Sequence, residues 1–336
     1  MSLQTSSILP RQNLTFFAAS LTVLIAFGAS ALPVPLMSTW TREFGLPTAG
    51  IGMTVLLYVI GNACSLLFFA RLSEVIGRRG AVFVSLLFGL AACAFFLLAN
   101  TPAFLMAGRL LQGLACGITT TAAMSWCVDS APPRRSWLAT AVSSSGPLAG
   151  FVIATIGAGV AIETQLAGTR GLFFCVLVLE LLVSLLVFLA SETVTTKSAK
   201  KGILKPSVMP PPGYGRRLAL AAAGFVGTSA LTCFFQGFSA RVAEGLLGTD
   251  APIALLSGLV YISLVLPNAL GAFAAAKFPP LKVFAPVGLL YVVTGCGTFL
   301  SVAWRLPELF IAFAPGFSPR STSSATWAPA FRTSSS

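Results

Sequence analysis

Long apolar segments alternate with short polar connections along the first 305 residues of the chain. A helix needs about 20 apolar residues to cross the hydrocarbon core of a bilayer. Nine segments come close to that length: 15–37, 49–70, 81–99, 103–127, 138–160, 171–190, 218–239, 253–275 and 283–303. This pattern predicts an all-α, polytopic membrane protein with nine spans.

The composition agrees with the pattern. The 336 residues are 56% hydrophobic and only 9% charged, with a mean hydropathy of +0.90, which excludes an ordinary soluble domain. The net charge of +12 would indicate a nucleic-acid partner in a soluble protein. Here the charges lie between the apolar segments, so we expect the lipid bilayer, and no nucleic acid, as the partner.

The positions of the basic residues predict the topology. Connections that would lie on one side of the membrane hold 14 Lys and Arg residues, and those on the other side hold 4. Because Lys and Arg accumulate in cytoplasmic loops, the N-terminus is predicted to be cytoplasmic. The connection 191–217 is the longest of the basic ones and is rich in proline, which is typical of an extended linker outside the membrane.

These features divide the chain into four parts. Residues 1–190 hold the first six predicted spans, 191–217 is a cytoplasmic linker, and 218–305 holds the last three spans. In 306–336, Pro315 and Gly316 interrupt the apolar start of a tenth span, and a tail rich in Ser, Thr and Pro follows. Such a tail cannot bury a helix in lipid. We expect a truncated or frame-shifted product, with a genuinely divergent ending as the alternative.

The connection between the second and third spans carries the most specific motif. It contains Leu72-Ser73-Glu74 followed by Gly77-Arg78-Arg79. This resembles the loop between helices 2 and 3 of the major facilitator superfamily, Gly-x-Leu-x-Asp-x-x-Gly-Arg-Arg, with Ala70 in place of the first glycine and Glu74 in place of the aspartate. The resemblance implies a helix bundle in which residues 1–190 form a six-helix half and residues 218–305 form an incomplete second half of about three spans. It further implies a monomer in a bacterial-type inner membrane, with two halves that rock about a central substrate site. It also implies that Glu74, Gly77, Arg78 and Arg79 form an inner gate.

The fourth span contains an arginine inside an apolar helix. Arg109, Gln112 and Gly113 lie on one helical face because they are three and four residues apart. An ionisable group in a span is costly unless it faces a cavity or a partner. The sequence resembles the family motif Arg-x-x-Gln-Gly, which implies that Arg109 takes part in substrate binding or proton coupling. The alternative is an arginine that extends along the helix to the bilayer surface.

Prolines and glycines mark two other spans. Pro33 and Pro35 lie near the end of the first span, where they would free helix carbonyls that neighbouring helices must satisfy; the alternative is a simple helix end before a polar outer loop from Trp40. In the fifth span, Gly146-Pro147-Leu148-Ala149-Gly150 resembles the Gly-Pro-x-x-Gly motif of the antiporter branch. Gly146, Pro147 and Gly150 therefore predict a kinked, closely packed helix.

Four more polar residues lie in or beside the spans. Glu180 is near the middle of the sixth span and is a candidate proton carrier, or else a neutral, hydrogen-bonded structural acid. Gln236 and Asn268, in later spans, either line a cavity or pair between helices. Asp129 begins the second inner loop, which runs to Arg135; the loop as a whole is expected to set topology and to form hinge ion pairs.

Other chemistry is poorly supported. The chain has no histidine, its seven cysteines lie in or beside apolar segments, and it contains no C-x-x-C spacing. We therefore expect no metal, no cofactor and no enzyme activity, since paired acid and base groups are also missing. The leading hypothesis is a secondary active transporter that exports small molecules by alternating access, with protons as the coupling ion. The alternative is a non-transporting, truncated membrane fragment.

Overall fold

The structure is a computed structural model that describes residues 5–132 and 137–194 of the chain. It also describes isolated positions in the later part: 215, 233–234, 236–239, 242, 289, 293, 296–297, 300 and 304. The predicted linker from residue 195, most of the three later spans and the tail lie outside the described residues.

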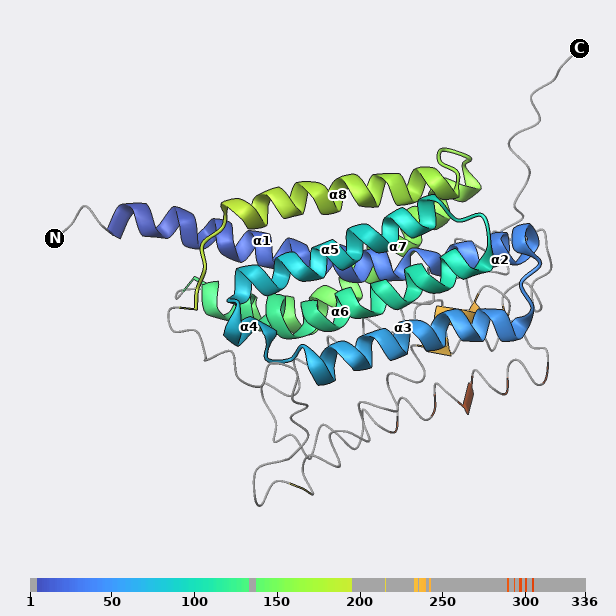
Figure 1. Ribbon diagram of the computed structural model, residues 1–336, viewed down its shortest axis with the longest axis horizontal. Coiled ribbons are helices and arrows are strands. Elements are labelled where there is room, and N and C mark those ends of the chain that lie inside the picture. The colour runs from blue at the N-terminus through green and yellow to red at the C-terminus, as the bar shows by residue number, and fades with distance from the viewer. Residues whose placement is uncertain are drawn as a thin grey trace, which may run out of the picture.

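The two long described ranges fold entirely into helices and short connections (Figure 1). The helices are α1 (Thr5–Ala31), α2 (Pro33–Phe44), α3 (Thr48–Phe68), α4 (Leu72–Val75), α5 (Arg78–Leu97), α6 (Pro102–Ser130), α7 (Trp137–Glu163) and α8 (Thr169–Leu189). Within the described residues, six helical stretches are long and apolar enough to cross a membrane, with Gln12–Phe44 counted as one. The six predicted N-terminal spans are confirmed.

The end of the first span differs from the prediction. The helix does not give way to a polar loop at Trp40 but continues to Phe44, and only Gly45, Leu46 and Pro47 connect it to α3. Trp40 is buried and its ring stacks on Phe96 and Phe173, with centroid separations of 5.6 and 5.9 Å. This packing holds α2 in place despite its polar residues.

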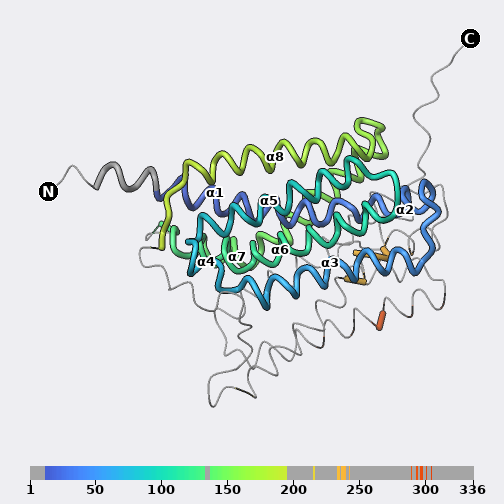
Figure 2. The backbone as a smooth tube through the Cα atoms, in the orientation of Figure 1, coloured from blue at the N-terminus to red at the C-terminus, as the bar shows by residue number. Residues whose placement is uncertain are grey.

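The long helices run back and forth as a bundle, with α8 along one edge and α3 along the opposite edge (Figures 1 and 2). α6 packs most extensively on α3 and α5, α1 packs on α7 and α6, and α8 covers α5 and α1. The connection that holds α4 and the C-terminal ends of α6 and α8 lie at the same end of the bundle. That end is the predicted inner side.

Two apolar clusters fill the interior, one toward each end of the long helices. The first contains Ala18, Val82, Trp126 and Val187, and the second contains Trp40, Phe96, Leu105 and Phe173. In α1, α5, α6 and α8 alike, the segment between the two clusters carries polar groups or glycine. The bundle therefore has a polar layer halfway along the helices, a level called mid-height below. The candidate site lies in this layer.

Glycine permits the closest helix contacts. A Cβ atom on Gly113 of α6 would overlap the backbone of Tyr58 in α3, and one on Gly150 of α7 would overlap the Leu24 carbonyl of α1. The Gly150 contact confirms the predicted close packing of this part of α7. The helix is continuous through Pro147. Gly146 has more room, because a Cβ atom there would lie 3.2 Å from the side chain of Val23.

A stability measurement tests the contact at Gly150. Gly150→Ala should destabilise the folded chain by about 1–3 kcal/mol, the usual cost of overpacking. Gly157→Ala is the matched control because it lies in the same helix and a Cβ atom there meets nothing within 4 Å. Thermal unfolding of the detergent-solubilised variants should show a lower midpoint for Gly150→Ala alone; equal midpoints would contradict the close α1–α7 contact.

Candidate functional site

Arg109 occupies the polar layer and is completely buried, with 0% of its surface exposed. Its Nη1 donates a hydrogen bond to the Ser30 carbonyl of α1 at 2.8 Å and another to Gln112 Oε1 at 3.3 Å. The guanidinium carbon also lies 5.4 Å from the centre of the Tyr58 ring in α3, within cation–π range. The side chain thus contacts α1 and α3 and does not extend along α6 to the bilayer surface.

Gln112 supplies a hydrogen-bond donor that Pro33 of α2 cannot provide. Its Nε2 donates to the Ala29 carbonyl of α1 at 2.8 Å. In an uninterrupted helix that carbonyl would accept from the residue four positions later, which here is Pro33 and has no N–H. The prediction that a neighbouring helix satisfies a freed carbonyl is therefore confirmed at Ala29. Leu32 keeps a helical backbone across the break.

Cys116 completes this group, one turn beyond Gln112, because its Sγ lies 3.5 Å from the Ala26 carbonyl of α1. We call Ser30, Tyr58, Arg109, Gln112 and Cys116 the central polar cluster. All five are buried. They come from α1, α3 and α6, so a relative shift of any of these helices must change the contacts of Arg109.

Glu180 also lies at mid-height, but it contacts α5 and does not belong to the central polar cluster. Its side chain is 1% exposed and its Oε2 lies 3.8 Å from Cys93 Sγ of α5. A Cβ atom on Gly89 would meet the same carboxyl group. Glu180 therefore faces α5, while exposed apolar residues such as Leu181 and Leu185 cover the outer side of α8.

The two predicted site residues of the later spans have different outcomes. Gln236 is described and buried at 1% exposure. Its neighbours Gly237 and Phe238 lie against Val55 and Gly52 of α3, so this segment adjoins the helix that carries Tyr58. Asn268 lies outside the described residues.

A second polar group lies at the predicted inner end. Gly77 has φ +94° and ψ +162° and precedes α5. The Glu192 carboxylate, just beyond α8, accepts hydrogen bonds from the backbone N–H groups of Arg78 and Arg79 at 2.9 and 3.1 Å. It also accepts from the N–H groups of Thr193 and Val194. The carboxylate thus satisfies donors at the N-terminus of α5 and complements the helix dipole.

Arg78 joins this group to α6. Its Nε forms an ion pair with Asp129 Oδ2 at 3.0 Å, and its Nη1 donates to Ser73 Oγ at 2.7 Å. We call Ser73, Gly77, Arg78, Asp129 and Glu192 the inner-loop network. The ion pairing expected of the second inner loop is confirmed at Asp129. Glu74 is exposed, and its side chain makes no hydrogen bond or ion pair to any other described residue.

The described residues bring no three Cys, Asp or Glu side chains together in a way that could hold a metal ion. What the arrangement offers is one buried cation with polar neighbours at mid-height, and a hydrogen-bonded connection between helix ends at one side.

The sequence pattern that defines the Major Facilitator Superfamily matches residues 19–333. The chain belongs to this superfamily. This membership confirms the prediction of a transporter-family protein rather than an enzyme.

A bacterial protein of the same type is similar in sequence. The chain is 28% identical over 254 residues to an uncharacterised MFS-type transporter, YybF, of Bacillus subtilis (strain 168). That match covers 73% of this chain and 56% of the relative, so the chain spans little more than half the length of this relative.

Solved structures of transporters share the fold. A bacterial homologue of the human lysosomal transporter Spinster, in an inward-facing and occupied conformation, matches with a TM-score of 0.60 and 17% identity, over 94% of this chain and 77% of that chain. A D-xylose–proton symporter matches with a TM-score of 0.57 and 14% identity, over 90% of this chain and 79% of that chain.

Glu192 was not among the residues that the sequence predicted for a site. The available signal was an acid immediately after the sixth span, in a connection that is otherwise basic. An acid at that position can face the N-terminus of another span, where the helix dipole favours negative charge. Its partners Arg78 and Arg79 lie more than 100 residues earlier, so no local pattern indicated the contact.

The role of this carboxylate can be measured directly. Glu192→Gln should lower the stability of the folded chain by about 1 kcal/mol, because it removes a charge at a helix N-terminus. Glu163→Gln is the control, since Glu163 is an exposed acid at the C-terminal end of α7. Thermal unfolding midpoints in detergent compare the two; a loss of similar size in Glu163→Gln would show that the position of Glu192 is not special.

Proposed function

We propose that this chain acts as a secondary active transporter that exports small molecules by alternating access, with protons as the coupling ion. The observation that carries the proposal is the completely buried Arg109, which donates to a carbonyl group of α1 at mid-height. A charge at this depth is costly in a membrane protein and is typical of a substrate or ion pathway.

In this proposal Arg109 and Gln112 form the coupling site. Arg109 holds a positive charge against which an anionic or electron-rich group of a substrate can bind. Its bonds to Ser30 and Gln112 would have to rearrange when α1 and α6 move. Gln236, on a segment beside α3, and Asn268 are the proposed contributions of the second half.

The inner-loop network is the proposed gate on the cytoplasmic side. It ties the start of α5 to the ends of α6 and α8 through Arg78 and Glu192. Gly146, Pro147 and Gly150 provide the pliable part of α7. We assign Glu180 to the packing of α8 on α5, because its side chain faces Cys93 and Gly89.

The resemblance of α7 to the antiporter motif supports proton coupling and efflux. A fold relative that is a proton symporter by name supports proton coupling alone. Reconstituted proteoliposomes test the proposal. Compounds from a panel of small molecules that carry an anionic or electron-rich group should dissipate an imposed pH gradient, and a protonophore should stop their uptake into the proteoliposomes. Uptake that continues at the same rate after the gradient is collapsed would contradict proton coupling.

A further inference from the structure

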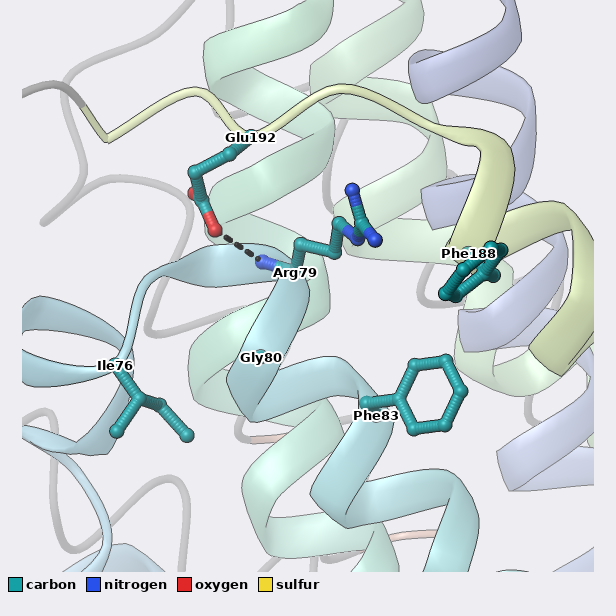
Figure 3. A pocket seen from close by; sticks show the side chains of 6 residues that line it. All are labelled: Ile76, Arg79, Gly80, Phe83, Phe188 and Glu192. Atoms are coloured by element: carbon teal, nitrogen blue, oxygen red, sulfur yellow. Dashed lines mark hydrogen bonds between the residues drawn. The ribbon is translucent and has the colours of Figure 1, made fainter.

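A cavity of about 480 Å³ opens at the predicted inner end of the bundle, outside the central polar cluster. Its lining residues are Ile76, Arg79, Gly80, Phe83, Phe188 and Glu192 (Figure 3). Phe188 is 60% exposed, so the cavity opens on the outer surface of the bundle and not toward its interior.

The cavity lies where two apolar spans give way to polar connections, which is where lipid headgroups meet acyl chains in a bilayer. It is formed by the first turns of α5, which begins at Arg78, and the last turn of α8, which ends at Leu189. Both helices are mostly apolar beyond these turns, and polar connections adjoin them on the other side. The polar and apolar parts of the cavity therefore coincide with the two parts of a membrane lipid.

Arg79 is a cation, and only one nitrogen of its guanidinium group donates a hydrogen bond to another described residue. Its Nη1 donates to the Ala190 carbonyl at 3.3 Å, and its guanidinium lies 5.3 Å from the centre of the Phe188 ring. No carboxylate among the described residues forms an ion pair with it. Glu192 binds backbone N–H groups instead, and Figure 3 shows the Arg79 side chain pointing away from the Glu192 carboxylate.

The remaining guanidinium donors suit a phosphate group, which arginine binds through two parallel hydrogen bonds. Apolar side chains continue from the cavity toward the bilayer centre. Phe83 and Leu87 are one turn apart on the same face of α5, and Leu87 is exposed. Leu185 and Phe188 are exposed on α8. Two acyl chains can pack along these side chains.

We propose that this cavity binds an anionic glycerophospholipid, with its phosphate on Arg79 and its acyl chains along α5 and α8. The charge of the chain favours this occupant, because Lys197, Lys200 and Lys201 closely follow Glu192 in the sequence and basic segments beside spans attract anionic lipids. The proposal goes beyond the proposed transport function and does not depend on it.

Native mass spectrometry of the purified full chain tests the proposal with defined lipids. Phosphatidylglycerol has a net negative headgroup, and phosphatidylcholine carries the same phosphate beside a positive choline. We expect one phosphatidylglycerol to remain bound under activation that removes other lipids, with a preference of about fivefold over phosphatidylcholine, as one basic residue near an anionic surface contributes. Equal retention of the two lipids would overturn the proposal.

Variants locate the lipid. Arg79→Gln should remove the preference for phosphatidylglycerol, and Arg71→Gln, at an exposed position in the same connection, should retain it. Loss of the preference in both variants, or in neither, would contradict the assignment to this cavity. The charge-conserving Arg79→Lys should retain a preference and provides the comparison if Arg79→Gln does not fold. Displacement of the lipid by excess inorganic phosphate would show a free-phosphate site instead and would also overturn the proposal.

Discussion

Arg109→Ala is expected to lower coupled transport on the order of 10- to 100-fold while the chain still inserts into the membrane. Each hydrogen bond of a charged group contributes about 1.5–3 kcal/mol, and Arg109 donates to the Ser30 carbonyl and to Gln112. Insertion depends on the apolar spans, and replacement of an arginine by alanine makes α6 more apolar. Uptake into proteoliposomes measures transport, and membrane fractionation measures insertion.

Two further variants isolate the cause. Arg109→Lys keeps the charge but lacks the planar guanidinium that lies over the Tyr58 ring, so its activity should fall between those of the wild type and Arg109→Ala. Arg42→Ala removes an exposed arginine at the end of α2 and should leave transport close to normal. Wild-type activity in Arg109→Ala would exclude Arg109 from the coupling site.

The helices of the first half could be predicted because their signal is local. Each span has a length and hydropathy that the bilayer requires, and Pro33 indicates a freed carbonyl by the chemistry of its own backbone. The partner of that carbonyl was not predictable, because Gln112 reaches Ala29 through the packing of α6 on α1. The sequence indicated that Arg109 is important without showing which groups hold it.

The features that the sequence did not predict have a common origin. Arg42 and Glu43 lower the hydropathy at the end of the first span and indicated a loop. The stacking of Trp40 on Phe96 and Phe173, from helices much later in the chain, keeps this segment helical. Glu192 likewise acquires its place through contact with the start of α5. Both features depend on tertiary contacts that override the local preference.

Gly77→Ala should disrupt the inner-loop network and impair both stability and transport. Gly77 has a backbone conformation that is essentially restricted to glycine, at a cost of about 1–3 kcal/mol for other residues. A Cβ atom there would also overlap the Glu192 carboxylate. Gly45→Ala is the matched control, because Gly45 has φ +60° and ψ +32° but no atom within 4 Å of a Cβ position. Thermal unfolding and proteoliposome uptake should show the larger loss for Gly77→Ala.

A double-mutant cycle separates the backbone conformation from the overlap. In a Glu192→Ala background the carboxylate is gone, so Gly77→Ala should cost less there than in the wild type. The remaining cost is that of the backbone alone. If Gly77→Ala lowers the unfolding midpoint equally in both backgrounds, the contact between Gly77 and Glu192 does not hold the start of α5 against the end of α8. The gate would then have to depend on the ion pair between Arg78 and Asp129.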